Sequence, residues 1–241
     1  MLSSRECPDC FAAIEDSSAQ RCGYCGIMLS SRECPDCFAA IEDSSAQRCG
    51  YCGSELFKDS LADLGQFDPD EIKKYLKFYT TLINEDAHHT EALRGLGLCY
   101  LKMGIYPLAQ QQFEQVIEIA PDDAPAYYYY VLASVKGRRL KTLRLSEARL
   151  FEQYLLTALQ LDNQAPQYRL LLAMLKRDYY EVNGMKVSPP NAAELLKDLY
   201  LKEIDEEEAK YLEKSVKVSG QEEYFKGLSK KKRDSTDTDR Q

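Results

Sequence analysis

The residues best placed to do chemistry are cysteines. Eight of the nine cysteines form four CxxC pairs, which are Cys7/Cys10, Cys22/Cys25, Cys34/Cys37 and Cys49/Cys52. The first two pairs are separated by 11 residues, and the last two repeat this spacing. A tight turn places two thiolates at two corners of a tetrahedron, and a second turn completes a closed four-sulfur metal site. Such a site leaves no position open for water, so we expect the metal to serve folding.

The cysteines lie in two identical copies of the block MLSSRECPDCFAAIEDSSAQRCGYCG, at residues 1–26 and 28–53. The block has few large apolar side chains, among them Phe11, Ile14 and Tyr24, so it cannot bury enough surface to offset its ordering entropy. Bound Zn²⁺, one ion in each block, is expected to supply most of the folding free energy. Redox-active dithiols and extracellular disulfides remain alternative uses of these cysteines.

The stretch CPDCFAAIEDSSAQRCGYCGIML resembles the short bacterial zinc ribbon, in which a CPxCG turn, a linker and a CxxCG turn hold one zinc ion. The resemblance implies two ribbons of short β-hairpins, at 1–27 and 28–54. Phe11 and Phe38 stand where that family usually has glycine, so we expect slight strain at the first turn of each ribbon. Complete identity of the copies indicates a recent in-frame duplication, and we expect the first copy to be dispensable.

The charge of the ribbons bears on their partners. Each block holds two basic residues against four acidic ones, in a chain of net charge −8. Nucleic-acid binding needs Lys and Arg to release the counterions condensed on phosphates. Nucleic acid is therefore an unfavourable partner, although a nucleic-acid- or ribosome-associated accessory protein remains the alternative function.

Beyond residue 54 the composition favours helices. ELFKDSLADLG predicts a linker helix within 55–67. Asp68, Pro69 and Glu71 then provide an N-cap, a proline at the first helical position and a capping-box partner. We expect a helical domain over 68–215.

The stretch EALRGLGLCYLKMGIYPLAQQQFEQVIEIAPDD resembles one tetratricopeptide repeat. In that pattern small residues at Gly97 and Ala109 let two helices approach closely, while Tyr100 and Phe113 fill the space around them. A lone hairpin cannot bury its apolar face, and APAYYYYVLASV and APQYRLLLAML begin further candidate hairpins. The predicted fold is mainly α, a tetratricopeptide-like solenoid of about three hairpins that follows the two zinc ribbons.

The resemblance implies a concave groove lined by the first helix of each repeat. Its exposed positions are expected to be Arg94, Leu98, Lys102, Tyr128, Leu132, Lys136, Arg169, Lys176 and Arg177. A basic and aromatic groove in an acidic chain indicates an acidic or carboxylate-bearing peptide, or a partner protein that presents one. An ordinary solvated helix face is the alternative explanation of these basic residues.

Other features favour a scaffold over an enzyme. The chain has no glycine-rich phosphate loop and no histidine near a candidate nucleophile, and Glu206 to Glu208 read as a surface charge run. Cys99 is expected to be a buried small hydrophobe. We therefore predict a non-enzymatic interaction scaffold or adaptor.

The location and the C-terminal end follow from composition. Residues 1–30 lack a basic stretch followed by an apolar run, and nowhere do eighteen apolar residues run together, so we expect a cytoplasmic protein without a membrane span. Residues 216–241 are predicted to be a disordered polar tail. The basic run 230–233 within it is interpreted as solubilising, with a nucleic-acid or membrane patch as the alternative.

Overall fold

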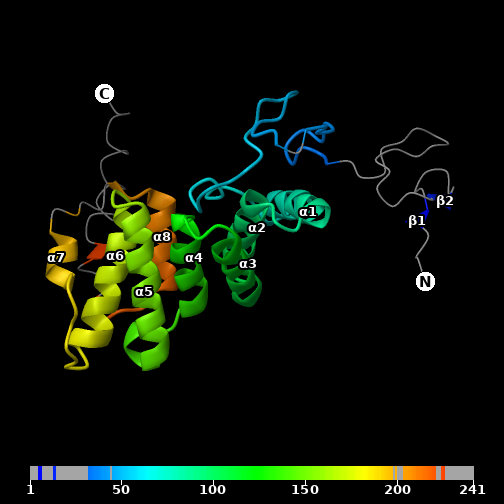
Figure 1. Ribbon diagram of the computed structural model, residues 1–241. Helices are drawn as coiled ribbons and strands as arrows, with labels where there is room; N and C mark the ends of the chain where they lie inside the picture. The colour runs from blue at the N-terminus through cyan, green and yellow to red at the C-terminus, as the bar shows by residue number, and fades with distance from the viewer. Residues whose placement is uncertain are drawn as a thin grey trace, which may run out of the picture.

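The computed structural model describes residues 5–6, 13–14, 32–43, 45–197, 199, 203–220 and 224–225 of the 241-residue chain. This part is mainly α-helical, as predicted (Figure 1). The helices are α1 (Pro69–Glu85), α2 (Thr90–Lys102), α3 (Tyr106–Ile119), α4 (Ala124–Val135), α5 (Leu145–Leu161), α6 (Pro166–Leu175), α7 (Ala192–Leu196) and α8 (Glu206–Ser215). A 3₁₀ turn, η1 (Leu140–Thr142), precedes α5, and a π-helical segment, η2 (Lys176–Glu181), extends α6. None of the described helices combines the length and the apolar character needed to cross a membrane.

Short β pairings occur in both copies of the repeated block. Strands β1 (Arg5–Glu6) and β2 (Ala13–Ile14) are antiparallel, with Glu6 opposite Ala13. In the second copy the equivalent residues form the antiparallel bridge Glu33 to Ala40. The predicted ligands of the first ribbon, Cys7, Cys10, Cys22 and Cys25, lie outside the described residues.

Helix α1 begins as its capping pattern predicts. The Asp68 carboxylate accepts hydrogen bonds from the backbone N–H groups of Asp70 and Glu71, both at 2.8 Å. The Glu71 side chain accepts from the backbone N–H of Asp68, also at 2.8 Å. These bonds satisfy donors that a helix N-terminus otherwise leaves unpaired, and so they fix the start of α1.

The helices pack mainly against their neighbours in sequence, from α1 on α2 to α6 on α7. Glycines bring the first helices close together, because a Cβ at Gly97 would lie 2.8 Å from the ring of Phe113 and a Cβ at Gly95 would lie 2.5 Å from the ring of Tyr79. Helix α8 breaks this order and returns to pack against both α4 and α6 (Figure 1).

The predicted linker helix over 55–67 is wrong. This segment forms a series of turns, although Leu56, Leu61 and Leu64 are almost completely buried. The Asp63 carboxylate accepts from the backbone N–H of Asp59 at 3.0 Å and from that of Ser60 at 2.9 Å. Such local bonds compete with helix formation, so the segment joins the core as a folded loop.

The predicted boundary of the polar tail at residue 216 is also wrong. Val216 is 0 % exposed, and the backbone carbonyl of Lys217 accepts a 3.1 Å hydrogen bond from the N–H of Leu140. Tyr224 and Phe225 are buried as well. Short apolar groups such as these lack a recognisable period, so composition alone did not reveal them. Residues 226–241, with the basic run, lie outside the described residues.

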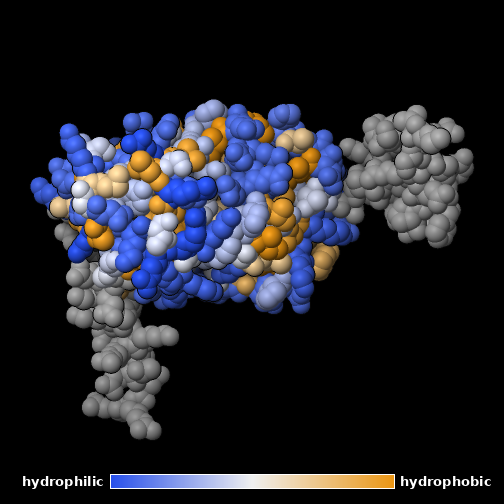
Figure 2. All heavy atoms as spheres, turned by 90° about the horizontal axis from the view of Figure 1, so that it is seen from below, coloured by the Kyte–Doolittle hydropathy of each residue, from blue (hydrophilic) through white to orange (hydrophobic). Residues whose placement is uncertain are grey.

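Figure 2 shows one face of the molecule, where hydrophobic side chains form several separate patches among hydrophilic ones. Scattered apolar side chains are normal on a protein surface and do not by themselves mark a binding site.

Candidate functional site

The second copy of the repeated block, called the second ribbon below, brings its four cysteines together. The sulfur atoms of Cys34, Cys37, Cys49 and Cys52 all lie within 4.8 Å of one another. The Cys34 to Cys52 and Cys37 to Cys49 sulfur distances are both 3.7 Å. A tetrahedral ion with metal–sulfur bonds of about 2.3 Å requires sulfur separations of about 3.8 Å, whereas a disulfide requires about 2.05 Å. The four thiols can therefore bind one metal ion, as the CxxC spacing predicted.

Two matching turns hold these cysteines. The backbone N–H of Phe38 donates to the carbonyl of Cys34 at 2.9 Å, and Gly53 donates to Cys49 at the same distance. Both donors have a left-handed backbone, with φ of 61° at Phe38 and 76° at Gly53. Glycine adopts this conformation without steric cost and phenylalanine does not. The strain expected at Phe38 is thus present.

This geometry predicts unequal effects of alanine at the two glycines of the second turn. Gly53→Ala is expected to cost about 1 kcal/mol, or roughly fivefold in metal affinity, because alanine is strained at positive φ. Gly50→Ala is the control, since neither position has an atom within 4 Å of the new Cβ and only Gly53 has a positive φ. Competition with a chromophoric chelator would measure both, in a chain whose first site is removed by Cys22→Ser and Cys25→Ser. Equal affinities of the two variants would contradict the prediction.

The cluster has a buried side and an exposed side. Burial raises the pKa of the Cys34 thiol to about 12, whereas hydrogen bonding with Ser54 lowers the pKa of Cys52 to about 6. Metal ligation requires thiolates. Metal binding must therefore displace a firmly held proton from Cys34, while Cys52 ionises readily at the exposed edge.

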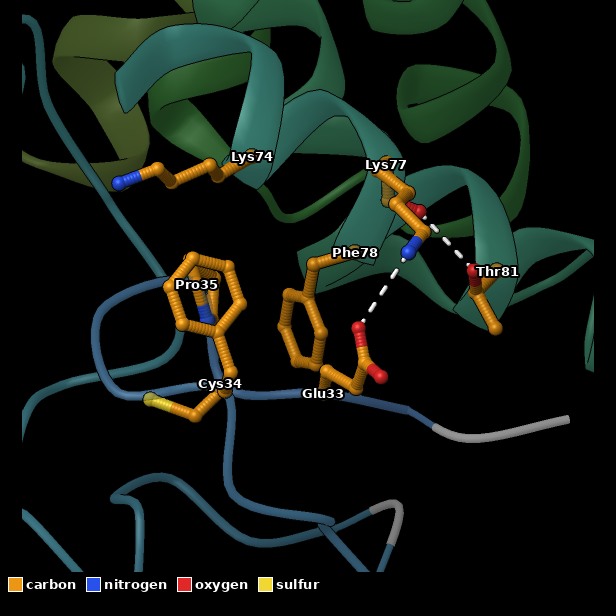
Figure 3. Close-up of a pocket in the computed structure, with 8 residues that line it drawn as sticks. Glu33, Cys34, Pro35, Lys74, Lys77, Phe78 and Thr81 are labelled. Atoms are coloured by element: carbon orange, nitrogen blue, oxygen red, sulfur yellow. Dashed lines mark hydrogen bonds and ion pairs between the residues drawn. The ribbon is translucent and has the colours of Figure 1, made fainter. Parts of the chain in front are cut away.

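The second ribbon docks on α1 through polar contacts. The Tyr75 hydroxyl donates to both carboxylate oxygens of Asp36 at 3.2 Å. Lys77 pairs with Glu33 at 3.3 Å, as Figure 3 shows. At the far end of α1, a buried Arg32 pairs with Glu85 at 3.2 Å.

A contact with an aromatic ring and close packing complete this interface. Lys74 lies 5.2 Å from the centre of the Phe38 ring, as in a cation–π contact. The cavity between the ribbon and α1 measures only about 50 Å³, with Cys34 and Phe78 in its lining (Figure 3). That volume is far below the roughly 300 Å³ of a small-molecule pocket, so the interface is a packed contact.

The structure corrects the predicted open groove. Leu98, Tyr128, Leu132 and Lys176 are each 0 % exposed, although they were expected to face solvent. Arg94, Lys102, Arg169 and Arg177 are partly buried, while Lys136 is exposed. Lys136 has a left-handed backbone at the C-cap of α4, so it ends that helix.

Several of these basic side chains bind other parts of the same chain. Arg94 pairs with Asp59 at 2.6 Å and with Asp123. The Lys102 ammonium group donates to the carbonyl of Gly65 at 3.0 Å. Of these partners, Asp59 and Gly65 belong to the loop over 55–67.

Two further basic positions, Arg169 and Lys176, are held in the same way. Arg169 donates to the carbonyls of Leu195 and Lys197 at the end of α7, at 3.0 and 2.8 Å. Lys176 pairs with Glu152 and donates to the Ser188 hydroxyl at 2.9 Å. Arg94, Lys102, Arg169 and Lys176 therefore hold internal segments in place of an external peptide.

Helix α8 supplies the central contact on the inner face of α4. The hydroxyls of Tyr128 and Tyr129 donate to the two carboxylate oxygens of Glu208 at 2.9 and 3.2 Å. The backbone N–H of Leu61 donates to the Tyr129 hydroxyl at 3.2 Å, so the loop over 55–67 joins the network. Glu208 is 4 % exposed, and burial raises its pKa to about 7.

The sequence interpretation missed Glu208, which it read as part of a surface charge run. Glu208, Leu212 and Ser215 are all buried on one face of α8, four and three residues apart. Spacing of this kind marks the inward face of a helix. That signal was available, but a carboxylate on the apolar face was not recognised.

Cys99 is 0 % exposed in α2, and burial raises the pKa of its thiol to about 12, which confirms the predicted buried hydrophobe.

Comparison with protein-family models finds no match, and a search of curated proteins finds no relative. The described residues form a mainly helical protein with a four-cysteine site able to bind a metal ion.

Proposed function

We propose that the protein is a non-enzymatic interaction scaffold, built from structural zinc ribbons and a tetratricopeptide-like helical body. Four thiolates in a tetrahedral arrangement favour zinc or an iron–sulfur centre over other metals. The ribbon resemblance favours zinc between these two. With four cysteine ligands the ion has no open position for a substrate, which supports a structural role.

The ligand of the body is proposed to be an acidic amphipathic helix. The observation that carries this proposal is the buried carboxylate of Glu208 between the hydroxyls of Tyr128 and Tyr129. An acidic or carboxylate-bearing peptide was predicted for a groove that includes Tyr128, and α8, whose first turn is acidic, contacts that residue. Helix α8 therefore acts as an internal ligand, and a partner would present a similar helix.

The recognised pattern can be read from α8. Glu208 supplies the carboxylate, while Ala209 and Leu212 are 0 % exposed on the same side. Helices that bind in grooves are recognised through anchors spaced three and four residues apart. A partner helix would carry glutamate, a small residue next to it and leucine four residues after the glutamate.

Weakening α8 is expected to open this site. Ala209→Pro places proline in the interior of α8, where it costs about 3 kcal/mol. A labelled peptide of residues 203–220, with its native alanine, should then bind the full-length variant at least roughly tenfold more tightly than it binds the wild-type chain. Fluorescence anisotropy would measure both affinities.

Two controls make the result specific. Glu206→Pro places proline at the first position of α8, where it is tolerated, so the peptide affinity should stay at the wild-type level. Tyr128→Phe with Tyr129→Phe in the Ala209→Pro chain should weaken binding, because the buried carboxylate loses its donors. Equal binding to the Ala209→Pro and Glu206→Pro chains would refute the proposed site.

The nucleic-acid alternative gains no support from the second ribbon. Arg32 pairs with Glu85 and Arg48 pairs with Glu55, so both arginines of this copy face carboxylates. A non-enzymatic role, a cytoplasmic location and a protein or peptide partner stay predictions.

A further inference from the structure

The contacts that dock the second ribbon on the helical body come from the duplicated block. Arg32, Glu33, Asp36, Phe38 and Gln47 make the described side-chain contacts with α1 and α2. All five positions lie within 28–53, and their counterparts 27 residues earlier are Arg5, Glu6, Asp9, Phe11 and Gln20. The first ribbon therefore carries the same docking side chains.

The body offers one receiving surface for these two identical ribbons. It consists of Lys74, Tyr75, Lys77 and Glu85 on α1 and Glu91 on α2. Its charges complement those of the ribbon. Lys74 contacts an aromatic ring and Lys77 contacts a carboxylate. Glu85 contacts an arginine and Glu91 contacts an amide. A ribbon with the same sequence is recognised by the same contacts.

The residues that follow each ribbon are also related. Leu56, which is 0 % exposed, comes three residues after the last glycine of the second ribbon. Leu29 holds the same place after the first ribbon. The first ribbon is thus followed by a leucine that fits the pocket of Leu56.

We propose that the first ribbon, residues 1–26, is a second ligand for the α1 surface and docks there when the second ribbon loses its metal. In the intact chain the second ribbon holds the surface, because only the short segment 54–68 separates it from α1 and its effective concentration is high. With Leu29 in the place of Leu56, exchange loops out residues 30–56. The inference rests on the metal-dependent folding of the ribbons and is independent of the proposed groove ligand.

Paired cysteine variants of the full-length chain test this exchange. One variant carries Cys49→Ser and Cys52→Ser, a second carries Cys22→Ser and Cys25→Ser, and a third carries all four. Amide hydrogen exchange of α1 reports docking. With zinc present, both double variants should retain α1 protection close to that of the wild type. The quadruple variant should lose this protection.

A further substitution shows whether the first ribbon makes the contact. Asp9→Ala removes the counterpart of Asp36, which accepts from Tyr75. It should be silent in the wild-type chain but should lower α1 protection roughly tenfold in the Cys49→Ser/Cys52→Ser chain, as expected for a hydrogen bond to a charged group. Glu15→Ala is the control, because its counterpart Glu42 is exposed.

Three results would overturn the proposal. In the first, the Cys49→Ser/Cys52→Ser chain loses as much protection as the quadruple variant. In the second, Asp9→Ala has the same effect in both backgrounds. Protection that rises with protein concentration would show that the docked ribbon belongs to another chain, which contradicts exchange within one molecule.

Discussion

Removal of metal from both ribbons is expected to unfold the second ribbon and to lower the thermal midpoint of the helical body. Zinc contributes about 10–16 kcal/mol to the folding of zinc-finger peptides, and few apolar side chains of residues 32–54 could replace it. Unfolding would expose Tyr75 and Phe78, which are 1 % and 4 % exposed. Losing their burial costs roughly 3 kcal/mol, or a fall of the midpoint on the order of 6–12 °C.

Circular dichroism melts with and without a strong chelator would measure this effect. Zinc added back in excess should restore the original midpoint, because the cysteines remain reduced. If the cysteines are redox-active dithiols instead, removal of metal should yield reversible disulfides and an unchanged midpoint. That outcome would contradict a structural metal site.

The second large effect concerns pH. The pKa of Glu208 is about 7 in the folded chain, against 4.5 for an unburied glutamate. Because burial favours the neutral carboxyl group, its stabilising contribution is complete below about pH 4.5 and is lost as the pH rises through 7. Between about pH 5.5 and about pH 8 the free energy of unfolding should fall by roughly 2 kcal/mol from this group alone.

Glu208→Gln isolates this contribution, since glutamine keeps the size of the side chain and does not titrate. Urea denaturation at the two pH values should show that the variant lacks the fall seen in the wild-type chain. Other groups, including the metal ligands, are common to both proteins and cancel in the difference. Glu206→Gln is the control, because Glu206 is 62 % exposed, and its pH dependence should match that of the wild type. An unchanged pH dependence in Glu208→Gln would show that Glu208 is ionised in the fold.

Local sequence patterns predicted the features that depend on short spacings. The metal cluster follows from four cysteines within 19 residues, and the start of α1 follows from Asp68, Pro69 and Glu71. Both arrangements are decided by neighbouring residues, so a single sequence contains the necessary information.

The accessible face of the body could not be predicted in the same way. Tyr127 to Tyr130 point all round α4, so their pattern does not distinguish a covered face from an open one, and all four are buried. The partner of Tyr128 is Glu208, 80 residues further along the chain. Helical periodicity identifies an apolar face but not the distant segment that covers it, which is why buried residues were expected to line an open groove.

The helix predicted for residues 55–67 was wrong for a different reason. Its leucines have a spacing compatible with a helix, and all three predicted positions are buried. The hydrogen bonds from Asp59 and Ser60 to Asp63 favoured turns over a helix. Hydrophobic spacing thus identified the buried residues correctly but assigned the wrong backbone.

The most direct test of the proposed scaffold is amide hydrogen exchange of the full-length, zinc-loaded chain with a saturating concentration of the peptide of residues 203–220. If α8 is an internal ligand that a similar helix replaces, the amides of α8 should lose protection while those of α4 remain protected. Unchanged protection of α8 at every peptide concentration would show that α8 is a permanent part of the core, and would contradict a ligand site on the inner face of α4.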